Sequence, residues 1–335
     1  MLDLVIQAVP TDDSWITFDI PSFVQGFWSN TFSGLTYGAV YGLIALGYTL
    51  VYGVLNLINF AHSEVFISGV YAAVFTLTAL GFNGDAPNLG LPALIGDILL
   101  ALLAAMITSA IVAFLVEVVA YRTLRRRNPP RLVYLITAIG VSFTIQYSIF
   151  LWRGAQPEPS VILLPTTPVF DIFGGLVYNY EIVVIVAAIV AMVAVDQFIR
   201  RSRTGRGIRA VAQDPDTATL MGVNRQRIIV ITFIIGGLVA GIGAVAWIIL
   251  VPQGAQYNGG FILGVKAFAA AVLGGIGNVR GALLGGLLIG IIGNYGQTLL
   301  GAAEWSDVVA FVILVLVLIV RPTGLLGQSM GRSRA

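Results

Sequence analysis

Cysteine is absent from this 335-residue chain, histidine and lysine occur once each, and charged residues make up only 10% of the sequence. Without cysteine, disulfide bonds, thiol catalysis and Cys-based metal sites are excluded. The chain has a single histidine and no HExxH motif, so it lacks the residues that a metal-dependent hydrolase or a nucleophilic triad requires. We therefore expect that the protein is not an enzyme and has no catalytic residue and no metal site. The phosphate-binding pattern GxxxxGK(S/T) is also missing, and we expect this chain to bind no cofactor of its own.

Hydrophobic residues are abundant instead. They make up 58% of the chain, the mean hydropathy is +0.93, and 39 residues are glycine. A soluble protein of this length cannot bury so much apolar surface, whereas lipid solvates it directly. Several stretches exceed the roughly 18 uncharged apolar residues that mark a membrane helix. The composition therefore predicts an all-α, polytopic integral membrane protein.

Nine apolar stretches are expected to form helices that cross or enter the bilayer. They cover residues 27–53, 59–80, 91–120, 132–152, 181–199, 228–250, 261–277, 282–300 and 306–320. The third stretch is too long for a perpendicular crossing, so it must tilt or project into the cytoplasm. The seventh is short and rich in small residues, which leaves crossing and re-entry both open and the number of spans at eight or nine.

Charge is unevenly distributed between the links that join these stretches. Arginine gathers in the regions 121–131, 200–227 and 321–335, whereas acidic residues prevail in 81–90, 152–180 and 301–307. If nine spans simply alternate, all three basic regions fall on the same side of the membrane. Because cytoplasmic loops carry an excess of Lys and Arg, we expect a cell-membrane protein with its N-terminus outside and its C-terminus in the cytoplasm.

Three regions are expected along the chain. Residues 1–26 form an external acidic segment, residues 27–320 a single transmembrane domain, and residues 321–335 a cytoplasmic tail. The N-terminal segment lacks a basic n-region and a small-residue cleavage site, so it does not read as a signal peptide. The external link 152–180 contains four prolines. For it we favour a stiffened connector over a landing site for an external partner.

The loop 200–227 interrupts the apolar pattern and carries seven arginines. Asp214 is placed as an N-cap and Pro215 as the first helical residue, where a missing N–H costs nothing. Gly222 can take the left-handed conformation that ends a helix, and Asn224 offers a second cap. Four apolar residues of this short helix are expected to be partly exposed: Ala218, Leu220, Met221 and Val223. Docking on a soluble partner and an ordinary loop that folds on itself both remain open at this point.

The segment 53–73 is the first of two interrupted hairpins. Its polar residues are Asn56, Asn59, His62, Ser63 and Glu64. A carboxylate well inside a bilayer costs roughly 2.5–3.5 kcal/mol, so Glu64 should face protein, water or a helix start rather than lipid. We favour a role for Ser63 or Glu64 in capping the free N–H groups of a new half-helix. Alternatively, these residues line a substrate path, because broken helices are tolerated beside a cavity.

The segment 265–290 has the same layout of helix, polar break and helix, as a paired-repeat transporter would. Its break contains Gly274, Gly275, Gly277 and Asn278, a combination that suits a pore-lining turn. Beyond the break, Gly281, Gly285, Gly286 and Gly290 form one face of small residues. Such a face lets two helices approach closely, and we favour a packing role for the last three.

Four charged positions lie at or within the apolar stretches. Lys266 is expected to extend to the membrane interface, the common position of a lysine near the end of a span. Asp196 and Arg200 are four residues apart at a helix end, which predicts a local stabilising pair. A similar local role is expected for Glu117, whereas the environment of Asp97 is left open.

Six segments of the chain, in register, resemble one known family. They are LNLINFAHSEVFISGVYAA (55–73), YRTLR (121–125), LITAIGVSFTIQ (135–146), the arginine-rich run 201–241, the glycine-rich run 265–290 and RPTGLLG (321–327). Together they are similar to the LivH-type permeases of branched-chain amino-acid ABC importers, over nearly all of the chain after about residue 30. Two features depart from the family: the N-terminal thirty residues are longer and more acidic, and Ser63 stands where the family has glycine.

The resemblance implies a transport subunit with several partners and no nucleic acid. The expected partners are a second, homologous permease of the LivM-like kind, two ABC ATPase subunits that hydrolyse ATP on the cytoplasmic face, an extracellular or periplasmic substrate-binding protein, and the lipid bilayer. The stretch 206–224 would then be the element that couples the permease to the ATPases. That role is carried to Arg206, Gly207, Arg209, Ala210, Ala212, Asp214, Ala218, Met221, Gly222 and Asn224.

The coupling hypothesis treats residues 215–221 as a rigid lever that tilts the spans before and after it. Two rivals keep a transport function: closely related permeases import urea or short-chain amides, and an ion-coupled secondary transporter would work without an ATPase. The latter would need embedded charges that form an ion site, and Glu64, Asp97 and Lys266 show no evident cluster in the sequence. The sequence leaves open which amino acid is carried and whether the second permease is a copy or a paralogue.

Overall fold

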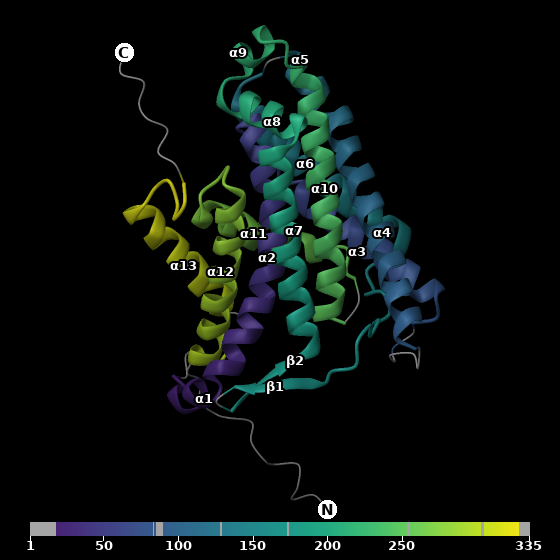
Figure 1. The fold of residues 1–335 in the computed structure, drawn as a ribbon, viewed down its shortest axis with the longest axis vertical. Helices are drawn as coiled ribbons and strands as arrows, with labels where there is room; N and C mark the ends of the chain where they lie inside the picture. The colour runs from purple at the N-terminus through teal and green to yellow at the C-terminus, as the bar shows by residue number, and fades with distance from the viewer. Residues whose placement is uncertain are drawn as a thin grey trace, which may run out of the picture.

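The computed structural model describes residues 18–82, 84, 90–127, 129–172, 174–252, 255–302 and 305–327. Most of the expected N-terminal segment, parts of the acidic links 81–90 and 301–307, and the tail after residue 327 lie outside the described residues. The elements are α1 (Ile20–Gln25), α2 (Phe27–Leu55), α3 (His62–Ala79), α4 (Leu91–Leu115), the π-helical turn η1 (Val116–Tyr121), α5 (Arg122–Arg127), α6 (Arg131–Arg153), β1 (Pro168–Ile172), β2 (Gly175–Tyr178), α7 (Asn179–Arg201), α8 (Arg203–Gln213), α9 (Pro215–Leu220), α10 (Arg225–Leu250), α11 (Gly259–Gly274), α12 (Val279–Leu300) and α13 (Trp305–Val320). Figure 1 shows the long helices side by side in one bundle.

Each of the nine apolar stretches forms a helix near its predicted bounds. Within the described residues, six helices are long and apolar enough to cross a membrane, and α11 and α13 are shorter apolar helices. Helix α3 is 18 residues long, but His62, Ser63 and Glu64 at its start lower its hydropathy. The all-α, polytopic membrane fold is confirmed, and whether α11 crosses or re-enters stays a prediction.

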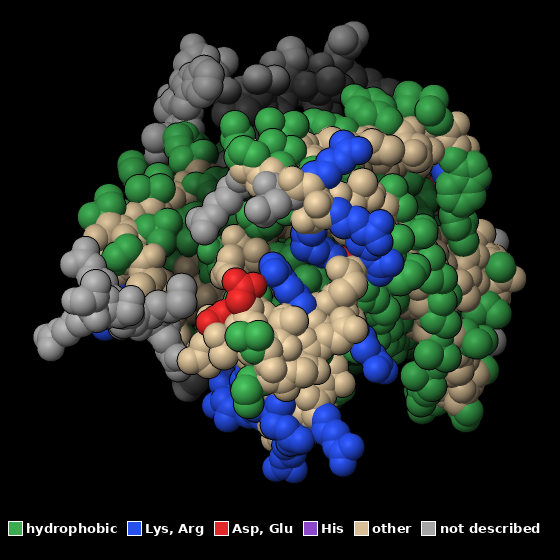
Figure 2. All heavy atoms as spheres, turned by 90° about the horizontal axis from the view of Figure 1, so that it is seen from above, with side chains coloured by type: hydrophobic (Ala, Val, Ile, Leu, Met, Phe, Trp, Pro, Cys, Tyr) green, Lys and Arg blue, Asp and Glu red, His purple; other side chains and the backbone are tan. Residues whose placement is uncertain are grey.

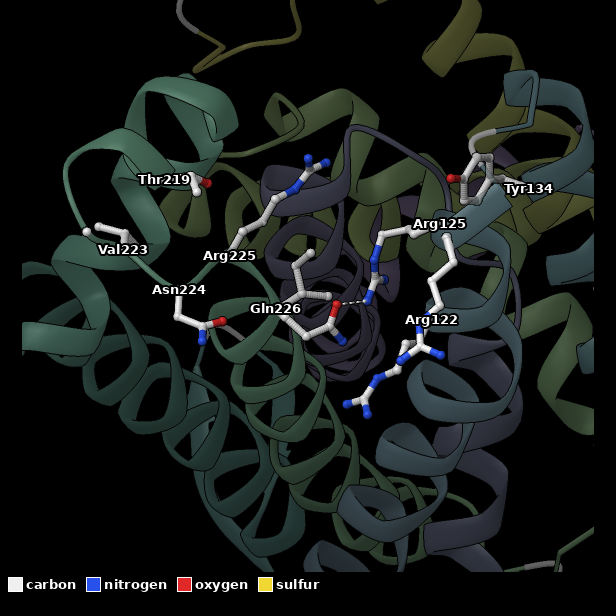
Figure 3. Close-up of a pocket in the computed structure, with 11 residues that line it drawn as sticks. Arg122, Arg125, Tyr134, Thr219, Val223, Asn224, Arg225 and Gln226 are labelled. Atoms are coloured by element: carbon white, nitrogen blue, oxygen red, sulfur yellow. Dashed lines mark hydrogen bonds between the residues drawn. The ribbon is translucent and has the colours of Figure 1, made fainter.

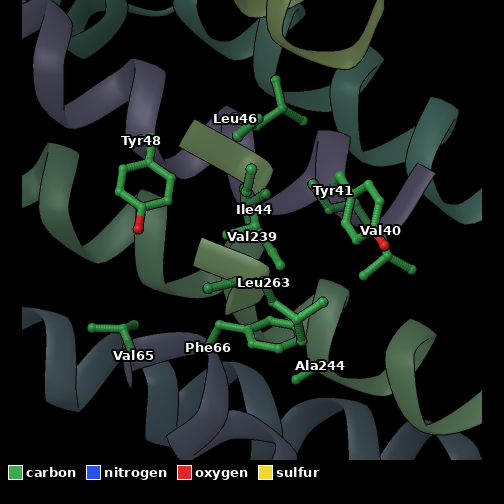
Figure 4. Close-up of a cluster of buried hydrophobic side chains, with 14 of the residues drawn as sticks. Val40, Tyr41, Ile44, Leu46, Tyr48, Val65, Phe66, Val239, Ala244 and Leu263 are labelled. Carbon is green, nitrogen blue, oxygen red and sulfur yellow. The ribbon is translucent and has the colours of Figure 1, made fainter. Parts of the chain in front are cut away.

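Helix α2 lies at the centre of the bundle and packs against α12, α10, α11 and α7. In its most apolar window 83% of the residues are buried, against 17% for the peripheral helix α6. Figure 4 shows how side chains from four helices fill the space around it: Tyr41, Ile44 and Leu46 of α2, Phe66 of α3, Val239 of α10 and Leu263 of α11. The core of the molecule is therefore built around α2.

The crossing of α2 and α12 is made by glycine against glycine. A Cβ atom added to Gly38 would lie 2.7 Å from the carbonyl oxygen of Gly286, so the backbones are in direct contact there. Gly290 packs in the same way against α2, whereas Gly285 faces the backbone of α11 at Ala270. The packing role expected for these glycines is confirmed, and it follows the rule that small residues allow close helix approach in membranes.

The helix of the third apolar stretch continues seven residues beyond its predicted end. Helix α4, the π-helical turn η1 and α5 form one helical segment from Leu91 to Arg127, 37 residues in all. At about 1.5 Å per residue this segment is roughly 55 Å long, which exceeds a hydrocarbon core of about 30 Å. The expected excess length is confirmed. The π-helical turn was not predicted, and such turns are frequent at functional sites.

A short β-hairpin was also missed in the link 152–180. Strands β1 and β2 pair antiparallel, and the turn between them is stabilised by a hydrogen bond from the backbone N–H of Gly174 to Asp171. Near the start of the link, the Arg153 guanidinium donates two hydrogen bonds of 2.5 and 2.7 Å to Glu158. The described part of the link therefore contains a hairpin and an ion pair, and its role as a connector rather than a landing site stays a prediction.

Helices α8 and α9 lie at the end of the bundle opposite α1 and the β-hairpin (Figure 1). They occupy the arginine-rich loop between α7 and α10. Figure 2 views this end face on, and many basic side chains, which are arginines, gather there beside a small acidic patch. The fold therefore places the predicted coupling loop and the basic link 121–127 on one face.

Candidate functional site

Helix α9 has the caps that the sequence predicted. The Asp214 carboxylate accepts hydrogen bonds from the backbone N–H groups of Asp216 and Thr217 at 3.0 and 3.1 Å, and from the Thr217 hydroxyl at 2.6 Å. These bonds hold the pKa of Asp214 below its usual value. Pro215 occupies the first turn, and Gly222 has φ +85°, the left-handed conformation expected after the helix.

The apolar residues of α9 divide into a buried and an exposed set. Leu220 is 88% exposed and Met221 is 80% exposed. Ala218 was expected to be partly exposed and is instead buried, because it faces the rest of the loop, while Val223 is half-buried. Two large apolar side chains therefore project from a helix that is fixed at both ends.

Helix α8 precedes α9 and was not predicted. The Ser202 hydroxyl caps it by accepting a hydrogen bond of 2.8 Å from the N–H of Gly205. Ile208 and Val211 are buried beneath α8, three residues apart on one face. That spacing, together with a serine before it, is the signal that could have revealed this helix. Arg209 donates from its guanidinium to the carbonyl oxygen of Ile199, which ties α8 back to α7.

The ten residues predicted for coupling lie on α8, α9 and the turn that follows. Six of them are exposed: Arg206, Arg209, Asp214, Met221, Gly222 and Asn224. Ala210 and Ala212 are half-buried, and Gly207 and Ala218 are buried. A Cβ atom on Gly207 would lie 2.7 Å from the Cδ1 atom of Ile228, so this glycine seats α8 against α10. Asn224 caps α10 by accepting a hydrogen bond of 3.0 Å from the N–H of Arg227.

A cavity of about 680 Å³ separates this loop from the end of α5. Figure 3 shows its lining, with Arg122 and Arg125 on one side and Arg225 and Gln226 on the other. The Nε atom of Arg122 and the Nη1 atom of Arg125 are buried and have no hydrogen-bond partner among the described residues. Because those two atoms are enclosed by the protein, the cavity offers the positive charge of its arginines rather than these donors, and arginine is the residue that best recognises carboxylates and phosphates.

Glu117 neutralises part of this charge from the π-helical turn. It is fully buried and pairs with Arg125 and, at 3.4 Å, with Arg122. Gln226 of α10 donates to Glu117 at 3.0 Å and accepts from Arg125 at 3.1 Å. Glu117 was expected to form only a local contact; in fact it joins the π-helical turn, α5 and the start of α10.

The π-helical turn also contacts the first interrupted hairpin. Tyr121 is fully buried, and its hydroxyl donates a hydrogen bond of 2.9 Å to the side-chain oxygen of Asn59. The Tyr121 ring lies 5.5 Å from the ring of Phe233 on α10. A continuous set of contacts thus runs from the first turn of α10 through Glu117 and Tyr121 to the polar segment before α3.

The capping role favoured for Ser63 or Glu64 is wrong. The residue that precedes α3 is Ala61, and no side chain caps that helix. The backbone satisfies the first turn by itself, because the N–H groups of Glu64 and Val65 bond to the carbonyl oxygen of Ala61 at 3.2 Å. The Ser63 hydroxyl donates back to Phe60, and Glu64 accepts a hydrogen bond of 3.3 Å from Ser142 of α6.

The other polar residues of this segment are mostly buried. Asn59, His62, Ser63 and Glu64 are at most 3% exposed, whereas Asn56 is exposed and ends α2 with φ +53°. The Nε2 atom of His62 and the Oε2 atom of Glu64 have no hydrogen-bond partner among the described residues. Buried polar atoms of this kind are usually satisfied by water or a bound molecule. Their proposed role in a substrate path stays a prediction.

The second polar break forms a tight turn at the end of α11. Gly275 and Gly277 both have positive φ, +103° and +93°. Asn278 caps α12 and donates a hydrogen bond of 2.9 Å to the carbonyl oxygen of Leu326, so the segment after α13 covers the turn. The first break instead packs beside α11 well before this turn, since a Cβ atom on Gly264 would touch Ser63. The structure therefore gives the two breaks different neighbours.

Two of the isolated charges have longer-range partners than expected. Lys266 pairs with Asp307 of α13, and its side chain is 14% exposed; its expected position at the membrane interface stays a prediction. Asp196 keeps its predicted local pair with Arg200 at 2.9 Å and also binds Arg280 of α12 at 2.9 Å. Sequence spacing reveals contacts along one helix but not contacts between helices, which is why these partners were missed.

Comparison with known proteins identifies the family of the chain. Residues 30–318 match the family model described as the permease component of the branched-chain amino acid transport system. The chain belongs to this permease family. It is 42% identical over 301 residues to the high-affinity branched-chain amino acid transport system permease protein BraD of Pseudomonas aeruginosa, a match that covers 88% of this chain and 94% of the relative. The permease is therefore a transport protein of the membrane.

Two further relatives show how broad the similarity is. The permease is 39% identical over 313 residues to the high-affinity branched-chain amino acid transport system permease protein LivH of Escherichia coli (strain K12), which covers 90% of this chain and 96% of the relative. It is 26% identical to the ribose import permease protein RbsC of the same organism, over 87% and 85% of the two chains. No solved structure matches the permease.

Proposed function

We propose that this permease is the membrane-spanning subunit of an ABC importer for branched-chain amino acids and is coupled through α9 to separate ATPase subunits. The observation that carries the proposal is α9 itself: a helix capped at both ends that presents Leu220 and Met221 at 88% and 80% exposure. Large apolar side chains exposed on a polar loop are typical of a protein contact. The high-affinity relatives support branched-chain amino acids as the cargo.

The surface around α9 favours a partner with acidic side chains. The cavity beside α9 is lined by Arg122, Arg125, Arg126 and Arg225. A carboxylate of the ATPase that entered this cavity would pair with these arginines, while an apolar pocket on the ATPase would receive Leu220 and Met221. Charge complementarity of this kind speeds association and fixes the orientation of the two partners.

Movement of α9 would reach the membrane helices by two routes. One passes through α8 and the bond from Arg209 to Ile199, and so to α7. The other passes through Asn224 into α10 and, by way of Gln226 and Glu117, into the π-helical turn. Because both routes consist of packed helices and hydrogen bonds, a displacement of α9 would tilt α7 and α10 rather than bend the loop.

The remaining assignments follow from the importer architecture. A second, homologous permease completes the pore, and a substrate-binding protein on the outer side delivers the amino acid. The ATPase subunits hydrolyse ATP, so the permease needs no cofactor of its own. Because α8, α9 and α5 carry the arginines, that end faces the cytoplasm, the N-terminus lies outside and the C-terminus in the cytoplasm.

Reconstitution with the neighbouring subunits tests the proposal. We expect the permease to purify with two ATPase subunits, and the complex in proteoliposomes to take up leucine, isoleucine or valine when ATP and the binding protein are present. Leu220→Asp together with Met221→Asp should abolish co-purification. Val169→Asp is the matched control, because Val169 is 46% exposed on β1 at the opposite end of the bundle.

Two results would contradict the proposal. Uptake by the purified permease alone, without an ATPase, would favour an ion-coupled transporter. A binding protein that bound urea or short amides, and no branched-chain amino acid, would leave the architecture intact but replace the cargo.

A further inference from the structure

A second cavity, of about 440 Å³, lies in the half of the bundle that is remote from α9. Its walls come from α2, α10, α11, α12 and α13. Trp247 lines it near the end of α10 opposite to α9, and Asn294 and Gln297 line it from the last turns of α12. The volume falls within the roughly 300–1,000 Å³ that is usual for small-molecule sites.

The lining combines one cation, aromatic rings and amides. Lys266 contributes its ammonium group, which lies 5.6 Å from the centre of the buried Tyr41 ring. Trp247 adds a second aromatic surface, and Asn294 and Gln297 add amide oxygens and N–H donors. The only lysine of the sequence is therefore held by an ion pair with a neighbouring helix.

The ion pair of Lys266 leaves part of its hydrogen-bonding capacity free. Asp307 of α13 binds the ammonium group, but an ammonium group has three donors. A second carboxylate can therefore join without displacing Asp307. The negative charge of Asp307 would also weaken the attraction, which suits a site from which the ligand must leave again.

We infer that this cavity binds the zwitterionic amino acid during its passage, with the carboxylate of the ligand on Lys266. The ammonium group of the ligand would lie against the aromatic rings and the amide oxygens of Asn294 and Gln297. Its aliphatic side chain would contact the apolar wall formed by α11 and α12, where Ile262 and Ile289 line the cavity. This inference rests on the proposed function, because it names where the proposed cargo binds in the permease.

The absence of cysteine from the chain allows a direct test. Ser306 lines the cavity, so Ser306→Cys places one reactive thiol there with little change in volume. The complex of permease and ATPases, with the cysteines of its partners blocked beforehand, is treated with a charged methanethiosulfonate in nanodiscs. We expect L-leucine to slow the labelling of Ser306→Cys. Labelling of Val169→Cys on β1 should not respond, and mannitol at equal concentration should protect neither thiol.

Two substitutions of the ion pair are expected to shift protection in opposite directions. In the Ser306→Cys background, Asp307→Asn frees Lys266 and should lower the half-protecting leucine concentration by about two- to fivefold, the effect of a partly exposed ion pair. Lys266→Gln together with Asp307→Asn should raise it by about tenfold or more, because the charged hydrogen bond is lost. If the ion pair only held α11 to α13, the single and double variants would not change protection in opposite directions.

The outcomes separate this inference from the proposed function. If the unsubstituted complex takes up leucine but leucine does not protect Ser306→Cys, the cavity is not the binding site and the proposed function stands. Equal protection in the single and double variants of the ion pair would also overturn the inference. If the unsubstituted complex takes up no branched-chain amino acid, the proposed function itself fails.

Discussion

The hydrogen bond between Tyr121 and Asn59 gives a prediction whose size follows from burial. Tyr121 is fully buried and Asn59 is 3% exposed, so water cannot replace either partner. Tyr121→Phe removes only the hydroxyl and leaves the Asn59 side-chain oxygen unsatisfied. An orphaned buried acceptor costs about 1–3 kcal/mol of the free energy of unfolding. Asn59→Leu should cost a similar amount, because it leaves the Tyr121 hydroxyl without its acceptor.

The double substitution is the informative variant. When both partners become apolar groups of similar shape, the cost of an unmade hydrogen bond disappears. We therefore expect Tyr121→Phe with Asn59→Leu to be less destabilised than the sum of the two single variants by about 1–2 kcal/mol, within the range for residues in direct contact. Titration with SDS in mixed micelles, with tryptophan fluorescence as the signal, measures the free energy of unfolding.

A functional readout accompanies the stability measurement. If Tyr121 transmits movement from α10 to the segment before α3, Tyr121→Phe should lower leucine uptake in proteoliposomes more than it lowers ATP hydrolysis. Single effects on stability that add within about 0.5 kcal/mol would show that the two side chains act independently, and the reasoning would be refuted. Equal losses of uptake and hydrolysis would refute the transmission role alone.

Three other predictions concern the coupling loop and the helix crossing. Gly222→Pro and Asp214→Arg should uncouple ATP hydrolysis from uptake while membrane insertion stays normal, as measured by fractionation and by both activities; normal transport by both variants would exclude α9 as the lever. Because the pKa of Asp214 is lowered in the folded protein, its cap stabilises α9 fully at pH values above the ordinary Asp pKa of about 3.9 and is lost only as the pH falls through the lower folded pKa. Titration of Asp214 should therefore cause no change in co-purification with the ATPase between pH 6 and pH 8. The Asp214→Asn variant should likewise co-purify to the same extent at both pH values. Gly38→Val should prevent α2 and α12 from packing together, since even a Cβ atom at this position would lie 2.7 Å from the carbonyl oxygen of Gly286. That variant should be degraded or should aggregate. Gly53→Val is the control and should fold, because there is open space around Gly53.

The features that could be predicted from the sequence are those that depend on neighbouring residues. The lengths of the apolar stretches predicted the positions of nine helices, because each helix must match the thickness of the hydrocarbon core with its own residues. The cap at Asp214, the proline after it and the left-handed Gly222 were predictable for the same reason, since they satisfy backbone groups within one turn. The family was recognisable from motifs in register.

The features that were missed depend on contacts between distant parts of the chain. Lys266 and Asp307 are far apart in sequence, and so are Glu117 and Gln226, and no spacing rule joins them. The capping role of Ser63 and Glu64 failed because the backbone before α3 turns tightly enough to satisfy itself. Ala218 was misjudged because its burial is created by the fold of the loop around it. The functional roles of the ten coupling residues and of the two polar breaks still await the experiments above.

The crossing of α2 and α12 limits how the molecule can change shape. Where main chain lies directly on main chain, no side chain is available to change rotamer and absorb a sliding movement. These two helices must therefore move together as one rigid body. Any change between open and closed forms has to occur at helix interfaces that are lined by longer side chains. Helix α6 is mostly unburied, and it forms such an interface with α3, where Ser142 donates a hydrogen bond to Glu64.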